Sequence, residues 1–435
     1  MAELRLTQDE RSFLEKRCPY LKEDYLNWLQ KEFRFCPERE VKVEWMRNGG
    51  SLVVQSEPGS PRISHHGDEE LVEVTTTATN KLNSTGLIDS RVAQLQHQDT
   101  QHSSKQGEDI VEITIQGEWH QVILYEVPLL ALVSEAYFRF GDQDWSYDGQ
   151  FEAARSKSQR LVEAGASFAE FGTRRRRDYE TQRIVIQGLV AGSASLVNNS
   201  KEGEGAVAMT AQEAMEAGKG FLTGTSNLHF AHQFDLIPIG TMAHEWFMGT
   251  AAILGDASQA NRVALDRWAQ TYPSQVLGIA LTDTFTTEVF LKTFKGELAR
   301  DWNGVRHDSG DAFEFMERMI AHYDADPQVG PEMRRRKKIV FSDGLDTELA
   351  IRLYGAAVQK GIGATFGIGT HFTNDYYQLT QGEGEEKVKS PAMNIVIKLH
   401  SCAGRECVKL SDDHGKESGS VEAVALVKRQ IATLV

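Results

Sequence analysis

His244 is the residue of this sequence best placed to carry out nucleophilic chemistry. It lies in G-T-M-A-H-E-W (Gly240 to Trp246), directly after L-I-P-I-G-T, an apolar run of the kind that forms buried strands. Asp283 ends the next such run, G-I-A-L-T-D. A carboxylate that accepts one imidazole N–H orients the ring and leaves the other nitrogen nucleophilic. A lone histidine is more often structural, but an imidazole and a carboxylate at adjacent strand ends favour a catalytic pair.

Groups that can hold phosphates and sugar hydroxyls follow three further apolar runs. Arg306 and Asp308 stand in R-H-D-S-G-D, where a guanidinium beside carboxylates suits phosphate and hydroxyl ligands alike. S-D-G (Ser342 to Gly344) offers a hydroxyl, the Asp343 carboxylate for a magnesium-bound diphosphate or ribose, and a permissive turn. G-I-G-T (Gly367 to Thr370) lets backbone amides approach a phosphate closely, because glycine has no side chain. Each motif alone is weak, since a surface ion pair or a glycine-rich turn would explain it.

A run of four arginines, Arg174 to Arg177, follows another strand-like segment, S-F-A-E-F-G. Such a run is commonly a solvated helix surface. Its position directly after the strand end at Gly172 nevertheless predicts that at least Arg174 faces the pocket formed by the groups above.

A parallel β-sheet is the element that would bring these groups together. From about Ala166 onward, short β-branched or aromatic runs alternate with helical stretches, which is typical of βα units. Because parallel strands present their carboxyl ends at one face, the polar residues that follow them converge where α/β enzymes build their sites. The sequence therefore predicts an enzyme.

The flanking segments have a different character. Thr7 and Glu10 form a capping-box pattern at the start of a helix, and a hairpin is expected between residues 41 and 54. Residues 56–109 contain no Phe, Trp or Tyr and are expected to be a disordered or loosely ordered insertion. Further predicted elements are strands at 110–115, 122–127, 394–399 and 407–412, a helix behind Pro128, and a closing helix at 420–433.

Composition and charge exclude several classes of protein. The chain has 435 residues, of which 40% are hydrophobic, and a net charge of −15, which argues against a nucleic-acid or membrane-surface binder because phosphates would be repelled. No apolar run approaches the roughly 20 residues needed to span a bilayer. The polar, acidic start lacks the features of a secretory signal, so a cytosolic or nuclear location is expected. The four cysteines lack zinc-ligand spacing and are expected to be reduced structural thiols.

Six segments in this order resemble the nicotinate phosphoribosyltransferase family: F-G-T-R-R-R, T-G-T-S-N, G-T-M-A-H-E-W, R-H-D-S-G-D, F-S-D-G-L-D and F-G-I-G-T. The resemblance implies synthesis of nicotinate mononucleotide and diphosphate from nicotinate and phosphoribosyl diphosphate in NAD salvage. It also implies coupling to ATP hydrolysis through a transient phosphohistidine, a need for Mg²⁺, and a homodimer with shared sites.

The same resemblance implies an irregular, TIM-like α/β barrel. The barrel would cover residues 166–392. An N-terminal α+β domain, residues 1–165 with the insertion 56–109, would be completed by C-terminal strands and a helix from residues 393–435.

The resemblance also assigns roles to individual residues. His244 would be phosphorylated, with Asp283 as its orienting partner; Phe171 would stack on the pyridine ring, and Arg174 would lie near the base and the phosphates. The remaining substrate contacts would be Thr225 and Ser226 on the base side, Arg306 and Asp308 at the ribose phosphate, Asp343 and Gly344 at the sugar, and Gly367, Gly369 and Thr370 at the 5′-phosphate.

Ser226 is expected to set the preference for the acid over the amide. In the similar nicotinamide phosphoribosyltransferases, an aspartate at this position can accept a hydrogen bond from the carboxamide, whereas a serine removes a charge that would repel a carboxylate. A nicotinamide or quinolinate phosphoribosyltransferase remains the alternative enzyme.

The sequence departs from the family pattern in one respect. Members carry a D-x-Y-K-x-x-M motif whose tyrosine covers the base across the dimer, and these 435 residues contain no such motif. Loss of one face of an aromatic sandwich costs on the order of 0.5–1.5 kcal/mol beyond area burial, so weak nicotinate binding is expected. The second alternative is a shortened, inactive subunit that regulates a full-length enzyme.

Overall fold

The computed structural model describes residues 6–24, 26–27, 73–83, 108–194, 210–272, 276–379, 388–413 and 415–434. The hairpin predicted at 41–54, Cys36 and most of the insertion predicted at 56–109 lie outside the described residues. No helix in the described ranges is both long and apolar enough to cross a lipid bilayer.

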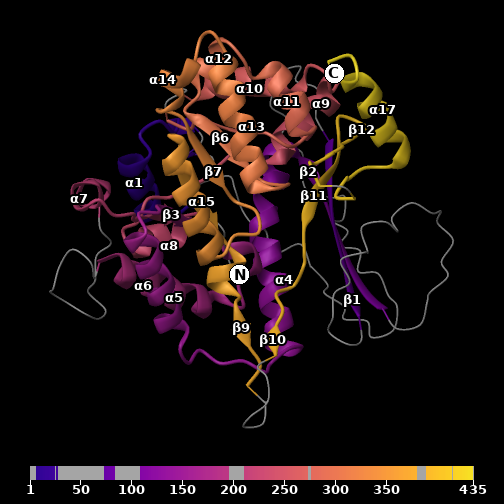
Figure 1. Ribbon diagram of the computed structural model, residues 1–435. Helices are drawn as coiled ribbons and strands as arrows, with labels where there is room; N and C mark the ends of the chain where they lie inside the picture. The colour runs from indigo at the N-terminus through magenta and orange to yellow at the C-terminus, as the bar shows by residue number, and fades with distance from the viewer. Residues whose placement is uncertain are drawn as a thin grey trace.

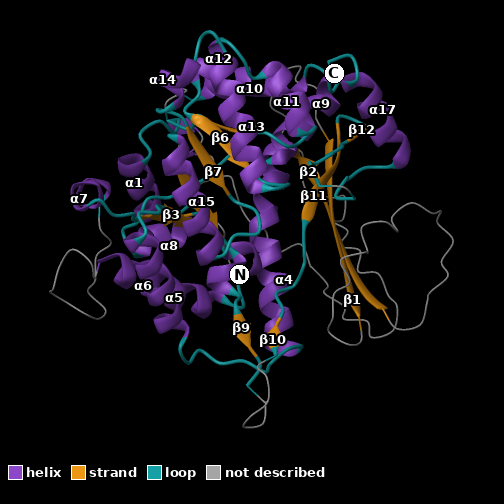
Figure 2. Ribbon diagram, in the orientation of Figure 1, coloured by secondary structure: helices purple, strands orange, loops and turns teal. Residues whose placement is uncertain are grey.

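A six-stranded parallel sheet forms the centre of the molecule, as predicted (Figure 2). Its spatial order is β4-β3-β8-β7-β6-β5, and every neighbouring pair is parallel. The strands are rich in β-branched and aromatic residues and are buried, which is typical of parallel strands covered on both faces. They are β3 (Phe168–Glu170), β4 (Leu222–Thr225), β5 (Ile279–Leu281), β6 (Gly304–His307), β7 (Lys338–Phe341) and β8 (Gly363–Ile368).

Helices connect and cover these strands, and polar residues in the connecting loops cap several of them. Asp311 accepts hydrogen bonds from the main-chain N of Phe313 and Glu314 at 2.9 and 2.8 Å, and Asp346 accepts from Leu349 N at 2.7 Å. The helices of this region are η3 (Thr173–Arg175), α6 (Tyr179–Ala194), α7 (Ala211–Ala217), α8 (Leu228–Gln233), α9 (His244–Leu254), α10 (Ala260–Thr271), α11 (Thr287–Thr293), α12 (Glu297–Asp301), α13 (Ala312–Ala325), α14 (Gly330–Arg334), α15 (Thr347–Lys360) and α16 (Thr370–Thr373).

The segment L-I-P-I-G-T, predicted as a strand, makes only a single parallel bridge between Pro238 and Thr225 of β4. Thr225 N donates to Ile237 O at 3.1 Å, and Ile239 N donates to Thr225 O at 2.9 Å. Pro238 has no N–H to donate, so the pairing cannot extend as a regular ladder. The segment nevertheless runs beside β4 and leads into His244.

A four-stranded antiparallel sheet stands beside the parallel one (Figure 1). Its order is β12-β11-β1-β2, with strands β1 (Glu73–Asn83), β2 (Glu108–Glu118), β11 (Ile397–Cys402) and β12 (Arg405–Glu406). A short two-stranded sheet joins β9 (Tyr376–Tyr377) to β10 (Lys389–Ser390). Because β11 pairs with β1, residues from the two ends of the chain share one sheet.

Several predictions for the flanking segments can now be compared with the structure. The strand at 110–115 lies within β2, and the strand predicted at 394–399 forms three residues later as β11. The segment 56–109 was predicted to be disordered or loosely ordered. Its residues 73–83 and 108–109 instead belong to strands, because β1 pairs with β2 on one side and with β11 on the other. The strand predicted at 407–412 is reduced to one antiparallel bridge between Lys409 and Ser418.

The terminal helices were predicted correctly. Helix α1 (Gln8–Arg17) begins with the expected capping box, in which Thr7 N donates to Glu10 Oε2 at 2.9 Å and Glu10 N donates to Thr7 Oγ1 at 3.2 Å. Helix α17 (Val421–Ile431) packs three apolar residues on the main core. The described cysteines, Cys18, Cys402 and Cys407, are buried free thiols.

The prediction of a strand at residues 122–127 is wrong, because this segment is helical. It forms the end of α3 (Trp119–Val122), the 3-10 turn η2 (Ile123–Tyr125) and the start of α4 (Glu126–Phe140). The buried residues of α4, Leu130, Ala131, Ser134 and Phe138, recur at helical spacing. Pro128 lies in the first turn, where a missing N–H costs nothing, so the helix begins before the proline.

The run of arginines is not a solvated helix surface. Arg177 is completely buried and lies against the rings of Phe138, Trp145 and Tyr376, with its guanidinium carbon 4.3, 5.4 and 5.2 Å from the three centroids. Its Nε donates to Asn374 Oδ1 at 3.0 Å and its Nη2 to Ser390 O at 3.2 Å. This side chain therefore ties α4 to the segment that contains β9 and β10.

Replacement of Arg177 by alanine should lower the free energy of unfolding by about 3 kcal/mol or more, because it opens a cavity and leaves two acceptors without donors. Urea unfolding followed by circular dichroism measures the change. The control is Arg262→Ala. Within the described ranges Arg262 makes only an exposed pair with Asp266, so this change should cost less than about 1 kcal/mol. Equal effects of the two substitutions would contradict a structural role for Arg177.

Candidate active site

The carboxyl ends of the parallel strands gather polar residues on one side of the sheet. Asp283, Asp308 and Ser342 follow β5, β6 and β7, and His244 is the first residue of α9, which follows the segment beside β4. This convergence was the central structural prediction from the sequence, and it is confirmed for these residues.

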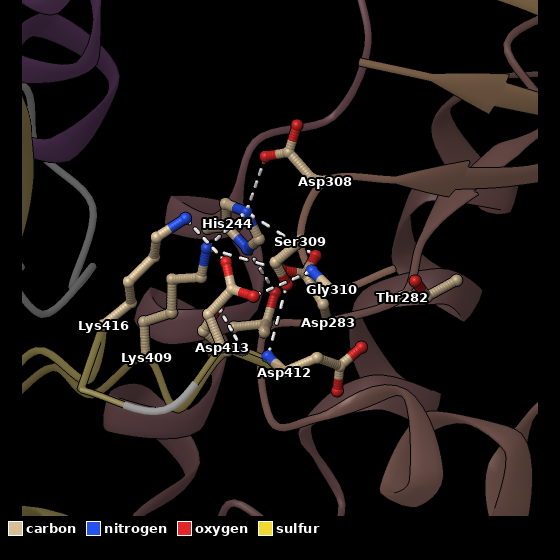
Figure 3. A network of polar contacts seen from close by, with 12 residues as sticks. His244, Thr282, Asp283, Asp308, Ser309, Gly310, Lys409, Asp412, Asp413 and Lys416 are labelled. Atoms are coloured by element: carbon tan, nitrogen blue, oxygen red, sulfur yellow. Dashed lines mark hydrogen bonds and ion pairs between the residues drawn. The ribbon is translucent and has the colours of Figure 1, made fainter. Parts of the chain in front are cut away.

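His244 lies at the centre of a buried polar network (Figure 3). Its Nε2 is 3.0 Å from Asp308 Oδ2 and 3.0 Å from Lys409 Nζ, and its Nδ1 is 3.0 Å from Thr284 Oγ1. Burial lowers the pKa of His244, although the nearby carboxylates oppose this effect. The neutral imidazole is therefore favoured, and this form keeps a nitrogen lone pair for nucleophilic attack.

Asp308 joins His244 to Arg306. Its second oxygen, Oδ1, accepts hydrogen bonds from Arg306 Nη2 and Ser342 Oγ, both at 2.7 Å. Burial alone would raise the pKa of Asp308, but the charge of Arg306 and the contact with His244 hold it well below its usual value. Asp308 therefore stays ionised and links the candidate nucleophile to the candidate phosphate ligand.

The guanidinium of Arg306 is held in one orientation. Besides its bond to Asp308, it donates from Nε to Ser342 Oγ at 2.8 Å and from Nη1 to Thr241 Oγ1 at 2.6 Å. Thr241 ends the segment that runs beside β4, so Arg306 connects β6 to that segment. A planar group fixed in this way suits recognition of a phosphate.

Asp283 does not make the hydrogen bond to His244 that the sequence predicted. Its Oδ1 is 3.7 Å from His244 Nε2, whereas Asp308 is at 3.0 Å. The other oxygen, Oδ2, accepts a hydrogen bond from Ser309 Oγ at 2.5 Å and faces Lys409 Nζ at 3.4 Å. Ser309 and Lys409 thus draw Asp283 away from the ring, and Asp308 is the carboxylate that contacts the ring, at Nε2.

A loop near the C-terminus covers these strand ends (Figure 3). Lys409 reaches His244, Asp412 accepts a hydrogen bond from Thr287 N at 2.8 Å, and Asp413 accepts from Gly310 N at 3.1 Å. Lys409, Asp412, Asp413 and Thr284 were not predicted from the sequence to lie at the site. The only signal was the polar run K-L-S-D-D, which was assigned to a strand of the N-terminal domain.

The second part of the site lies on β4, β3 and β8. Phe171 follows β3, and its main-chain N donates to Ile368 O of β8 at 2.8 Å. A Cβ atom at Gly367 would lie 2.5 Å from Phe171 Cε2, so only glycine allows the ring to occupy this position. Ser226 follows β4 and is exposed. Gly369 and Thr370 follow β8, which pairs with both β3 and β7.

Lys398 is a further positively charged side chain near the His244 network. Arg174 is partly exposed and lies 3.4 Å from Glu126, and Lys398 of β11 is close enough to Arg174, Lys409 and Asp308 to feel the charge of each. Burial, assisted by Lys409, lowers the pKa of Lys398 to about 8. The side chain of Arg174 lies near Glu126 of α4, and its place beside the base and the phosphates stays a prediction. Lys398 was not predicted, because it belongs to the antiparallel sheet.

Comparison with known proteins identifies the family. The model of the nicotinate phosphoribosyltransferase (NAPRTase) family matches residues 166–433, well over half of the chain. The chain belongs to this family. It is 41% identical to the nicotinate phosphoribosyltransferase of Saccharomyces cerevisiae over 74% of the chain and 69% of that protein. It is 35% identical to the enzyme of that name from Methanosarcina acetivorans over 97% of the chain and 82% of that protein.

A solved NAPRTase structure has a similar fold. The crystal structure of nicotinate phosphoribosyltransferase from Porphyromonas gingivalis is similar with a TM-score of 0.67 and 31% identity. The similarity covers 99% of this chain and 86% of that one. The mixed α/β fold with its parallel sheet is therefore that of NAPRTases.

One buried carboxylate joins the NAPRTase site to the antiparallel sheet. Glu245 follows His244 in α9, and its Oε1 accepts a hydrogen bond from Trp119 Nε1 at 2.7 Å. The Trp119 ring stacks on Trp246, and a Cβ atom at Gly249 would lie only 2.4 Å from it. Burial raises the pKa of Glu245 to about 7, even though the bond from Trp119 opposes this effect.

This raised pKa predicts a pH-dependent stability that Glu245→Gln should remove. The pKa rises from about 4.5 to about 7 on folding, so the stabilisation is complete below pH 4.5 and is lost as pH rises through 7. The loss should be on the order of 2–3 kcal/mol. Melting temperatures between pH 5 and 8.5 should fall less steeply for the variant, whose amide oxygen still accepts from Trp119. Parallel curves for the two proteins would contradict the raised pKa.

Proposed function

We propose that this protein transfers the phosphoribosyl group of phosphoribosyl diphosphate to nicotinate, giving nicotinate mononucleotide and diphosphate in NAD salvage. The observation that carries the proposal is that His244 and Arg306 share the Asp308 carboxylate at the sheet face of a NAPRTase-family chain. The names of the relatives support the same substrates.

The transfer needs positioning and charge stabilisation more than covalent chemistry. Its transition state resembles an oxocarbenium ion with a departing diphosphate, so groups that hold anions accelerate it. In the proposal, Arg306 binds the ribose phosphate part, Asp343 and Gly344 contact the sugar, and Gly367, Gly369 and Thr370 hold the 5′-phosphate. Phe171 stacks on the pyridine ring, beside Arg174, Thr225 and Ser226.

ATP would act through His244. In the tautomer whose Nδ1–H donates to Thr284 Oγ1, the Nε2 lone pair attacks the γ-phosphorus, the bond from phosphorus to the ADP oxygen breaks, and ADP leaves. The new group carries roughly two negative charges and would lie where Asp308 Oδ2 now lies. Repulsion would displace Asp308 and free Arg306 from it, which couples phosphorylation to the affinity for phosphoribosyl diphosphate.

Mg²⁺ fits the carboxylates of this site. One atom each from His244, Asp283 and Asp308 lie within 4.8 Å of one another, and Asp283 Oδ1 is buried without a hydrogen-bond partner in the described part of the chain. Because magnesium prefers oxygen ligands, Asp283 and Asp308 would hold it, and the imidazole would not. When bound, the ion would neutralise charge on the diphosphate.

The test of the proposed function is product formation by the purified chain. Nicotinate, phosphoribosyl diphosphate and Mg²⁺ should yield nicotinate mononucleotide, faster with ATP than without it. Faster turnover of nicotinamide or quinolinate would favour the alternative enzymes. No product with any of the three bases would favour the inactive regulatory subunit.

A separate experiment tests the phosphohistidine. Incubation with ATP labelled in the γ-phosphate should leave acid-labile label on the wild-type chain and none on His244→Ala. The reason is that the lysine and arginine nitrogens around His244 are protonated and have no lone pair for attack. His400→Ala, at an exposed position, should label like the wild type. Acid-labile label that persists in His244→Ala would refute the assignment.

The preference for nicotinate predicts the effect of a charge at Ser226. Ser226→Asp should lower kcat/KM for nicotinate by roughly five- to tenfold, because two carboxylates would face each other at an exposed position. Ser226→Asn has the same size without the charge and should lower it much less. Equal losses in the two variants would show that volume, not charge, sets the preference.

The finer architecture is also proposed. The segment beside β4 and the bond from Arg306 to Thr241 support an irregular α/β barrel at 166–392. The pairing of β11 with β1 supports an N-terminal α+β domain at 1–165 that residues 393–435 complete. A homodimer with shared sites and a cytosolic or nuclear location stay predictions.

A further inference from the structure

Glu170 is a buried carboxylate that lies beneath the base side of the site. It is the last residue of β3, and only 1% of its surface is exposed. Its Oε1 accepts a hydrogen bond from the main-chain N of Gly172 at 2.5 Å, and its Oε2 accepts from Thr225 Oγ1 at 2.6 Å. Gln182 Nε2 lies 3.1 Å from each oxygen. One side chain thus makes four hydrogen bonds, and it accepts in all of them.

Two partners of Glu170, Gly172 and Thr225, lie beside the residues assigned to the base: Gly172 follows Phe171, and Thr225 precedes Ser226. The loop after β3 contains Phe171, whose neighbours on both sides, Glu170 and Gly172, are joined by the first of these bonds. The loop after β4 contains Ser226, whose main-chain N donates to Glu170 O at 2.9 Å. Thr225 also accepts from Asn227 N at 3.1 Å. Both loops are therefore attached to the same residue.

Further hydrogen bonds hold Gln182, which donates to the Glu170 carboxylate. Gln182 Oε1 accepts a hydrogen bond from Arg176 Nη1 at 3.0 Å, and Gln182 Nε2 also donates to Thr173 Oγ1 at 2.8 Å. Burial raises the pKa of Glu170, while the bonds from Thr225, Gly172 and Gln182 oppose the rise. An amide or a protonated acid in this position would place a donor against donors.

We propose that Glu170 is a positioning residue for the base: its carboxylate holds the Phe171 loop and the Ser226 loop at the separation that the pyridine ring requires. This inference rests on the proposed function, because that proposal assigns Phe171 and Ser226 to the base. Glu170 does not touch substrate; it acts through Gly172 and Thr225. Its loss therefore weakens binding of the base and leaves binding of phosphoribosyl diphosphate largely intact.

The test measures the KM for nicotinate and the KM for phosphoribosyl diphosphate separately in the full chain. Glu170→Gln should raise the KM for nicotinate roughly five- to thirtyfold, which corresponds to the loss of one or two well-formed hydrogen bonds, and should change the other KM little. Gln182→Met removes the side-chain donor but keeps the carboxylate. It should give a smaller rise of the same selectivity, so the test does not depend on one variant folding.

A matched control separates positioning from general stability. Asp326 is also a buried carboxylate, and it accepts from the main-chain N of Gly296 and Gln328 at 2.6 and 2.9 Å after α13. Asp326→Asn should change neither KM. A rise of both KM values in Glu170→Gln, or of neither, would overturn the inference.

Phe171→Ala distinguishes this inference from the proposal beneath it. A raised KM for nicotinate in Phe171→Ala together with an unchanged one in Glu170→Gln overturns the role of Glu170 alone. An unchanged KM in Phe171→Ala overturns the assignment of the base side, and the role of Glu170 with it. Failure of the wild-type chain to use nicotinate overturns the proposed function itself.

Discussion

The site depends on the pairing of charges that the fold buries at the carboxyl ends of its strands. Asp308 is shared between Arg306 and His244, and Asp283 between Ser309 and Lys409. An unpaired charge at such depth would cost several kcal/mol, so each group constrains its neighbour. Burial lowers the pKa of His244 although its carboxylate neighbours oppose this, and the charge of Arg306 holds the pKa of Asp308 low, so the imidazole is neutral and Asp308 is ionised. Structure and chemistry thus follow from one electrostatic constraint.

Residues from distant parts of the chain complete the site. Lys409, Asp412 and Asp413 come from the loop before α17, and Lys398 comes from a strand that pairs with β1. The bond from Trp119 to Glu245 ties α9, and with it His244, to the end of β2. The antiparallel sheet therefore helps to hold α9 and His244 in place.

The two parts of the site use different means of positioning. Around His244, ionic groups hold one another, whereas on the base side a single carboxylate, Glu170, accepts only from neutral donors. This difference has a physical reason. Several hydrogen bonds from neutral donors can hold one buried carboxylate, whereas the imidazole, the carboxylates and the arginine around His244 must balance one another's charge.

The parallel sheet, the polar residues at its strand ends and the family could all be predicted from the sequence. Strand composition and the order of short motifs are local properties, so they can be recognised in the sequence without any information about long-range contacts. Prediction failed where a local pattern was ambiguous: residues 122–127 have a strand-like composition, but they lie in helical turns that lead into α4, whose buried residues recur at helical spacing. Three features became known only from the folded chain. Asp308 rather than Asp283 contacts His244. Arg177 is buried among aromatic rings, and Lys409 reaches the site. Each of these depends on distances between side chains far apart in sequence, which no spacing along the chain encodes.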